Sequence, residues 1–148
     1  MEFRNLGRSG LKVSAIGLGT HYFGWLHDEP TSAAVIGRAL DAGITFIDTA
    51  DAYDMGRSEE FVGRAIRGRR ADLVISTKFG FDVDLVTGQR RGSTNSRPEH
   101  IRQVVEAQLR RLRTDRIDLL YQHRVDPNVP IEDVVGAIKG LIRQGKVL

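Results

Sequence analysis

Four short apolar segments, each followed by an amphipathic stretch, set the strongest limit on how this chain folds. The apolar segments span residues 16–20, 44–48, 73–78 and 117–123. The amphipathic stretches repeat apolar residues at helical spacing and begin near residues 31, 58, 98 and 131. Strands that alternate with helices imply a parallel sheet with right-handed crossovers. The nearly continuous apolar runs agree, because strands of a parallel sheet are buried on both faces.

A short N-terminal segment precedes the four units. Residues 3–6 and 12–16 are separated by Gly7-Arg8-Ser9-Gly10, a pattern that predicts a hairpin over 3–16. Residues 146–148 resemble the start of a further strand. We therefore predict one α/β domain over residues 1–148, with the hairpin at 3–16 and about four βα units at 16–148.

Capping residues and glycines predict where the helices begin and end. Thr31 is the expected N-cap of the first helix and Ser58 of the second, with Gly43 and Gly68 at their ends. Pro98 suits the first turn of the third helix, and the fourth is expected over 131–143. Residues 79–97 form a long loop in this reading, and loops of such length are usually functional or mobile.

The composition excludes several classes of partner. The net charge of +3 comes from 22 basic and 19 acidic residues, and the arginines are scattered over the predicted helix faces, so we expect no nucleic-acid partner. The chain has no cysteine, so a thiolate metal site cannot form, and we expect no metal. The first residues lack the apolar region of a signal peptide. No run of about 18 apolar residues occurs, and we expect a cytoplasmic protein without a membrane partner.

Three successive predicted strands end in residues that can carry chemistry. These are Asp48, Lys78 and His123, and Tyr53 lies in the loop after the first of them. Each has a purely structural interpretation: a turn former, a solvent-facing lysine, a packed histidine and a core-edge aromatic. The carboxyl ends of parallel strands meet at one rim, however. When such strands close into a TIM-type barrel, that rim holds the active site.

The four residue types suit proton transfer to a carbonyl group. A phenol is a weak acid, and a nearby ammonium stabilises the phenolate that forms when it gives up its proton. A carboxylate paired with the lysine holds it in place, and a histidine can donate a hydrogen bond to a carbonyl oxygen. A side chain cannot supply a hydride, whereas a nicotinamide cofactor can.

The chain resembles the aldo/keto reductase family over essentially its whole length. The matching stretches are LGRSGLKVS at 6–14, GLGT at 17–20, FIDTADAY at 46–53, STK at 76–78 and DLLYQHR at 118–124. Residues 96–102 and 123–127 are most similar to the bacterial branch of the family.

The resemblance implies a (β/α)₈ barrel, closed at its bottom by the hairpin, that reduces aldehydes and ketones with NADP(H). It implies that Tyr53 is the general acid, that Lys78 assists its ionisation, and that His123 orients the substrate carbonyl. It also implies that Asp48 orients Lys78 and lies near the cofactor. Two further sets follow from the same resemblance: Gly19 and Thr20 at the cofactor, and Tyr22, Trp25 and His123 around the substrate.

The aromatic loop 21–27, which holds Tyr22 and Trp25, is equally compatible with a pocket wall and with a core edge.

Length is the one departure from the family pattern. A full barrel needs roughly 250 residues, so the 148 present predict a partial barrel, a hairpin plus about four βα units. We expect weak NADPH binding and self-association through the open barrel edges. The alternative function is a truncated, catalytically inactive half-barrel that acts only as an oligomerising or binding module.

Overall fold

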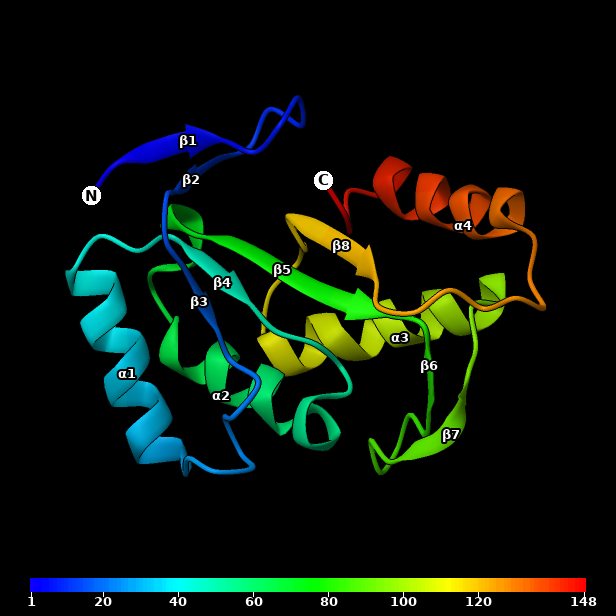
Figure 1. The fold of residues 1–148 in the computed structure, drawn as a ribbon, viewed down its shortest axis with the longest axis horizontal. Helices are drawn as coiled ribbons and strands as arrows, with labels where there is room; N and C mark the ends of the chain where they lie inside the picture. Colours follow the sequence, from blue (N-terminus) through cyan, green and yellow to red (C-terminus); the bar gives the residue numbers. More distant parts are fainter.

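The computed structural model describes residues 1–148 as a curved parallel sheet with helices on its outer side (Figure 1). Its elements, with η for 3₁₀ helices, are β1 (Phe3–Asn5), β2 (Lys12–Ser14), β3 (Gly17–Gly19), α1 (Glu29–Asp41), β4 (Phe46–Asp48), η1 (Tyr53–Gly56), α2 (Arg57–Ala65), η2 (Arg70–Asp72), β5 (Val74–Phe79), β6 (Phe81–Val83), β7 (Arg90–Thr94), α3 (Pro98–Leu112), β8 (Leu119–Gln122) and α4 (Ile131–Arg143).

The central sheet has the order β3-β4-β5-β8, and all its pairs are parallel. Each of these strands is followed by one helix, and consecutive helices pack against each other. The four βα units predicted from the pattern are therefore present, in the arrangement of a partial (β/α)₈ barrel. A parallel bridge between Ile117 and Val147 places the end of the chain beside the last strand, where the sequence predicted a further strand to start.

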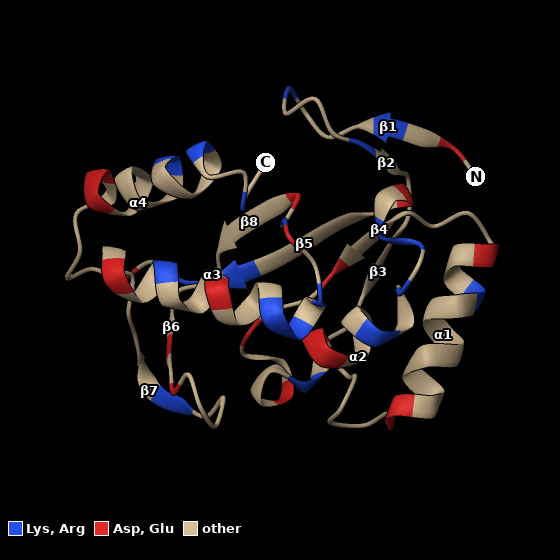
Figure 2. Cartoon of the chain, turned by 180° about the vertical axis from the view of Figure 1, so that it is seen from behind, with Lys and Arg blue, Asp and Glu red and all other residues tan.

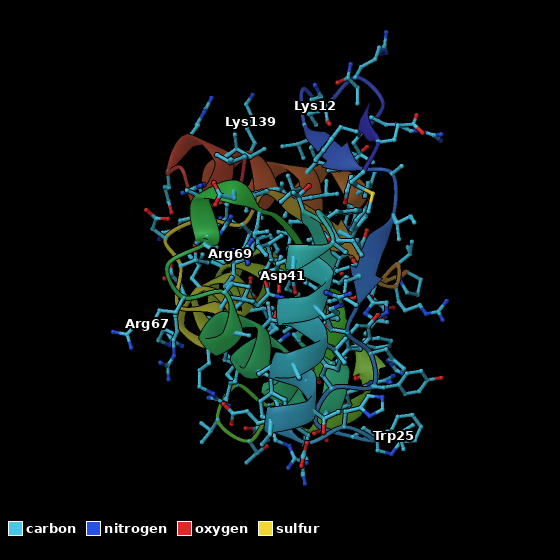
Figure 3. The ribbon with its side chains drawn as sticks, turned by 90° about the vertical axis from the view of Figure 1, so that its left-hand side faces the viewer. Lys12, Trp25, Asp41, Arg67, Arg69 and Lys139 are labelled. Atoms are coloured by element: carbon cyan, nitrogen blue, oxygen red, sulfur yellow. The ribbon has the colours of Figure 1, made fainter.

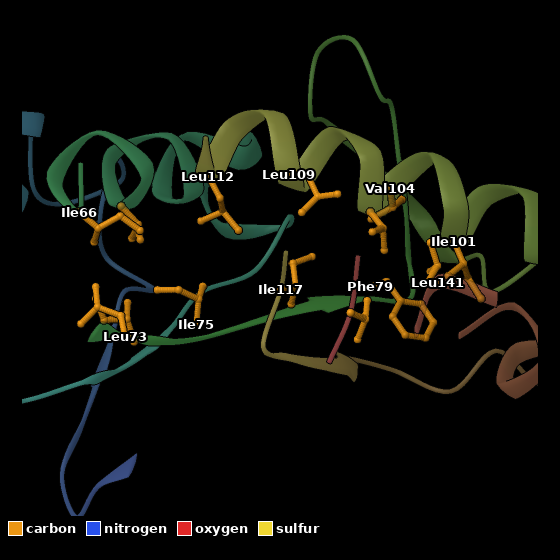
Figure 4. Close-up of a cluster of buried hydrophobic side chains, with 14 of the residues drawn as sticks. Ile66, Leu73, Ile75, Phe79, Ile101, Val104, Leu109, Leu112, Ile117 and Leu141 are labelled. Carbon is orange, nitrogen blue, oxygen red and sulfur yellow. The ribbon is translucent and has the colours of Figure 1, made fainter. Parts of the chain in front are cut away.

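The hydrophobic core lies between the sheet and the helices, as Figure 4 shows for β5 and α3. Ile75 of β5 and Ile101 and Val104 of α3 are completely buried. Phe79 and Leu112, also from these two elements, are almost completely buried. Each such side chain contributes about 1.5–3 kcal/mol through removal from water. This packing fixes β5, and with it Lys78, against the helical layer.

The predicted hairpin is present as β1 and β2, which pair antiparallel. Reciprocal hydrogen bonds join it to the residue before β4: the Ser14 amide donates to Thr45 Oγ1 (3.2 Å), and the Thr45 amide donates to Ser14 Oγ (3.0 Å). The hairpin thus lies at the amino ends of the strands, opposite the rim that carries Asp48. It leaves that rim uncovered (Figure 1).

Both helix starts predicted from capping residues were wrong. Helix α1 begins at Glu29, because the Asp28 carboxylate accepts a hydrogen bond from the Thr31 amide (2.9 Å) and makes Asp28 the N-cap, three residues before Thr31. Helix α2 has Gly56 at its N-cap position, with no side-chain cap. Ser58 is already inside the helix, and its buried hydroxyl donates to the carbonyl of Thr20 (2.9 Å). The first turn is therefore tied to β3 rather than capped locally.

The ends of several other elements also differ from prediction. Helix α2 ends at Ala65, before Gly68. Residues 79–97 are not one loop, because they contain the antiparallel pair β6 and β7. The last strand stops at Gln122, so His123 follows it directly. Helices α3 and α4 begin at Pro98 and Ile131, as predicted.

Charged residues of both signs are distributed along α2 and α3 (Figure 2). Figure 3 shows Arg67, Lys12 and Lys139 extending away from the body of the molecule. Ion pairs between exposed side chains of this kind contribute little to stability. None of the helices has both the length and the apolar character that a membrane span requires.

Candidate active site

The four residues predicted to carry chemistry meet at the carboxyl-end rim of the sheet. Asp48 is the last residue of β4, Lys78 lies near the end of β5, and His123 follows β8. Tyr53 begins η1, the turn that follows β4. We refer to Asp48, Tyr53, Lys78 and His123 as the tetrad.

Lys78 is the centre of the tetrad. Its Nζ donates hydrogen bonds to Asp48 Oδ2 (2.7 Å), to the Thr49 carbonyl (2.7 Å) and to Tyr53 Oη (3.2 Å). An ammonium has three donors, so all of them are used. The lysine side chain is only 14% exposed, and the other oxygen of Asp48 accepts a hydrogen bond from the Ser76 hydroxyl. The Asp–Lys–Tyr geometry is therefore fixed from several sides.

His123 contacts the ring of Tyr53. The two rings meet edge to face with centroids 5.9 Å apart, and Phe81 packs against His123 in the same manner at 4.9 Å. Burial lowers the pKa of His123, and the positive charges of Lys78, Arg124 and Arg90 lower it further. A neutral imidazole has one N–H to donate and one nitrogen that accepts, so His123 can donate to a carbonyl oxygen without carrying a charge.

The rings of the aromatic loop differ in how deeply they are buried. Phe23 is buried in the core, whereas Tyr22 and Trp25 are 50% and 63% exposed. Figure 3 shows Trp25 pointing outward at the periphery of the molecule. Both exposed rings contact His21, at 5.1 Å for Tyr22 and 5.9 Å for Trp25.

His21 is a rim residue that sequence reasoning missed. Its ring meets Tyr53 edge to face with centroids 4.7 Å apart. The signal that could have revealed it is its position one residue after Thr20, just past the end of β3, which matches the strand-end positions of the tetrad. His21 therefore joins the aromatic loop to the tetrad.

Gly19 and Thr20, predicted to contact a cofactor, face different ways. Gly19 pairs with Asp48 in the sheet and is exposed, and a Cβ there would meet nothing within 4 Å. Thr20 is completely buried. Its hydroxyl donates to the Asp48 carbonyl (3.0 Å) and lies 2.8 Å from Ser58 Oγ. Gly19 thus leaves open space beside Asp48, while Thr20 supports the backbone of Asp48 from behind.

A buried polar layer lies behind the tetrad and joins β5 to α2 and α3. Glu59 is completely buried and accepts hydrogen bonds from Thr77 Oγ1 (2.6 Å) and Arg111 Nε (2.7 Å). Gln108 Nε2 donates to Thr77 Oγ1 (3.2 Å) and to the Lys78 carbonyl (2.7 Å). These bonds fix the backbone of β5 at the position where Lys78 leaves the strand.

Asp51 adds a second carboxyl group to this layer. It is 2% exposed, and neither carboxyl oxygen has a partner in hydrogen-bonding geometry. Burial and the negative charge of Glu59 raise its pKa to about 7, against the opposing effects of Arg111, of the nearby Ala52 amide and of Lys78. Arg111 bonds Glu59 and reaches Asp51 only through its charge. Asp51 therefore retains its proton well above the pH at which an exposed aspartate loses it.

Comparison with known proteins adds the family to this geometry. A family model described as the aldo/keto reductase family matches residues 15–148. The chain is 40% identical over 153 residues to the aldo-keto reductase YhdN of Bacillus subtilis, a match that covers 99% of this chain and 45% of the relative. It is 35% identical over 147 residues to the aldo-keto reductase yakc [NADP(+)] of Schizosaccharomyces pombe, covering 97% of this chain and 43% of the relative.

Among solved structures, the aldo-keto reductase AKR11C1 from Bacillus halodurans in its holo form superimposes with a TM-score of 0.89 at 34% identity. The match covers 99% of this chain and 48% of that one. The chain spans about half the length of the curated relatives it matches. Because the family match extends over nearly the whole sequence, the chain belongs to the aldo/keto reductase family.

Proposed function

We propose that these residues carry out the proton-transfer part of an NADPH-dependent reduction of aldehydes and ketones. The observation that carries the proposal is the Lys78 ammonium, which bonds both the Asp48 carboxylate (2.7 Å) and the Tyr53 hydroxyl (3.2 Å). A phenol held against a fixed cation is a proton donor whose conjugate base is stabilised where it forms. The two curated relatives are named as aldo-keto reductases, which agrees with this chemistry.

Each member of the tetrad has one task in this mechanism. Tyr53 donates its phenolic proton to the carbonyl oxygen as negative charge develops there. Lys78 stabilises the phenolate left behind, and Asp48 keeps the lysine in place. His123, uncharged because of burial and its cationic neighbours, donates a hydrogen bond that orients the same oxygen.

The residues present fit the nicotinamide end of the cofactor. Gly19 leaves space open beside Asp48, whose carboxylate is one third exposed and can accept a hydrogen bond from a carboxamide. A bound reduced nicotinamide supplies the hydride to the carbonyl carbon. The choice of NADPH is supported by the fission-yeast relative, whose name includes NADP(+).

The test is the oxidation of NADPH, followed by absorbance, with 4-nitrobenzaldehyde as substrate. Tyr53→Phe removes only the hydroxyl and should lower kcat by about 10²–10⁴, the usual contribution of a positioned acid. Tyr121→Phe is the matched control, because Tyr121 pairs with Lys78 across the sheet but is 44% exposed. A Tyr53→Phe protein that keeps the original rate would contradict the assignment of the acid.

A second candidate function is a binding or oligomerising module without turnover. It is favoured by the free outer edge of β3, which pairs only with β4. Ile16 and Leu148 are also more than half exposed. Open strand edges promote association. Sedimentation of the 148-residue chain as a dimer or larger species, with no NADPH oxidation, would support this candidate, and a monomer that turns over would exclude it.

A further inference from the structure

A continuous row of rings crosses the site and ends at a guanidinium group. Successive centroid distances along the row are 5.9 Å (Trp25–His21), 4.7 Å (His21–Tyr53), 5.9 Å (Tyr53–His123) and 4.9 Å (His123–Phe81). The Arg90 guanidinium then lies 3.6 Å from the centroid of Phe81. The proton donor Tyr53 therefore contacts the rings of His21 and His123, and the Arg90 guanidinium lies one ring beyond His123, stacked on Phe81.

Arg90 makes no ion pair, although the next residue does. Arg91 bonds Asp84 at 2.8 Å, whereas no carboxylate lies within 4.0 Å of the Arg90 guanidinium. The carboxylate of Asp82, on the paired strand β6, instead faces the side chains of Ser93 and Asn95 (3.4 Å each). Stacking on Phe81 fixes the position of Arg90 and leaves its N–H donors unused.

Arg124 is a second cation without a carboxylate partner at this end of the site. It follows His123 directly, and its charge, like that of Arg90, acts on the imidazole. Lys78 and Asp48 neutralise each other within the tetrad. Two guanidinium groups without an ion-pair partner therefore act on the surroundings of His123. The carboxylates of Asp82, on the strand paired with that of Arg90, and of Asp126, two residues after Arg124, hydrogen-bond to uncharged groups instead.

Resting on the proposed carbonyl reduction, we propose that the substrate is an anionic carbonyl compound whose carboxylate binds Arg90. The carbonyl oxygen lies at Tyr53 and His123, and the negative group extends past His123 toward Phe81, with Arg124 adding attraction. A guanidinium binds a carboxylate through two parallel N–H donors, so a fixed Arg90 selects both the charge and its distance from the carbonyl group. Aldehydes with a carboxylate across a ring or a short chain fit this arrangement.

The test compares 4-carboxybenzaldehyde with 4-nitrobenzaldehyde, which have the same ring but differ in charge. We expect Arg90→Gln to lower the ratio of their kcat/KM values about tenfold, the loss of one charged hydrogen-bonding partner near the surface. Arg90→Lys keeps the charge and should recover part of the ratio. Arg91→Gln is the matched control, because its partner is Asp84, and the ratio should not change.

Two outcomes overturn the proposal. One is a ratio that is the same in Arg90→Gln as in the unchanged protein. The other is an Arg90→Gln protein in which the KM for NADPH rises and both aldehydes suffer alike, because Arg90 would then bind a phosphate of the cofactor instead.

A binding experiment separates this proposal from the proposed reduction. The alcohol 4-(hydroxymethyl)benzoate needs no turnover, and its binding can be followed through the NMR signals of the His123 imidazole. Saturable shifts that 4-methylbenzyl alcohol does not cause, and that Arg90→Gln weakens about tenfold, would support the anion site even in a protein without activity. Equal shifts with both alcohols would refute it.

Discussion

Asp51→Asn should stabilise the protein at alkaline pH and have little effect below about pH 4. The side chain is 2% exposed, two residues before Tyr53, and its pKa is raised from 3.8 to about 7 by burial and by Glu59. Asparagine has nearly the same shape but cannot ionise. The substitution therefore removes a buried charge without opening a cavity.

The sign and size follow from the difference between the folded and unfolded pKa values. Because the folded protein binds this proton more tightly, the stabilising effect of Asp51 is complete below about pH 4 and is lost as the pH rises to about 7. One pKa unit corresponds to about 1.36 kcal/mol, so a shift of about three units predicts a loss of at most about 4 kcal/mol. With water entry around the ionised carboxylate, we expect Asp51→Asn to be more stable by about 2–4 kcal/mol at pH 8.

Urea unfolding at pH 4 and pH 8 measures this effect. The difference in unfolding free energy between Asp51→Asn and the unchanged protein should increase with pH, with most of the change between pH 4 and 7. Asp115→Asn is the control, because that side chain is 87% exposed, and the same difference should stay flat. If the Asp51→Asn curve is parallel to that of the unchanged protein over this range, Asp51 does not retain its proton and the account of the buried layer is wrong.

Three further predictions test the packing and electrostatics around the site. Gly63→Ala should destabilise the protein by about 1–3 kcal/mol, because a Cβ there would lie 2.5 Å from the Arg111 carbonyl oxygen. Gly136→Ala is the control: a Cβ there meets no atom within 4 Å, so the substitution should stabilise the helix by about 0.5–1 kcal/mol. Thermal unfolding measures both. Arg111→Met should cost about 3–5 kcal/mol in urea unfolding by leaving Glu59 buried without its cation, and adding Glu59→Gln should recover part of that; no recovery would argue against the pair. In an NMR titration the His123 imidazole should have its midpoint below 6.5, and Arg90→Gln should raise it; a midpoint above 6.5 would show that burial and the cations do not act as described.

Much of the fold could be predicted because the signals for it are local. Helices α3 and α4 begin at the predicted residues, Pro98 and Ile131, since an amphipathic repeat after a proline is read within one or two turns. The four βα units and the hairpin follow from periodicity and glycine turns in the same way. The antiparallel pair β6 and β7 was missed, because β7 reads Arg-Arg-Gly-Ser-Thr and is exposed along most of its length, which leaves no apolar alternation to detect.

Local signals failed where a side chain has a distant partner. Ser58 has the type and position of an N-cap, yet its hydroxyl bonds the carbonyl of Thr20, 38 residues earlier. A tertiary hydrogen bond thus replaced the local one that the sequence pattern favours.

By itself the sequence determined the order of strands and helices and placed Asp48, Lys78 and His123 at strand ends. The reason is that the spacing of apolar residues distinguishes strands from helices, and the alternation of the two implies parallel strands. Only the tertiary structure decided that the Lys78 ammonium reaches both Asp48 and Tyr53. The tertiary structure also decided that Arg111, 52 residues from Glu59, bonds that carboxylate and places its charge near Asp51. These contacts depend on how far each side chain extends between packed elements and on which polar groups lose contact with water. Neither can be recognised from the residues that are neighbours in the sequence.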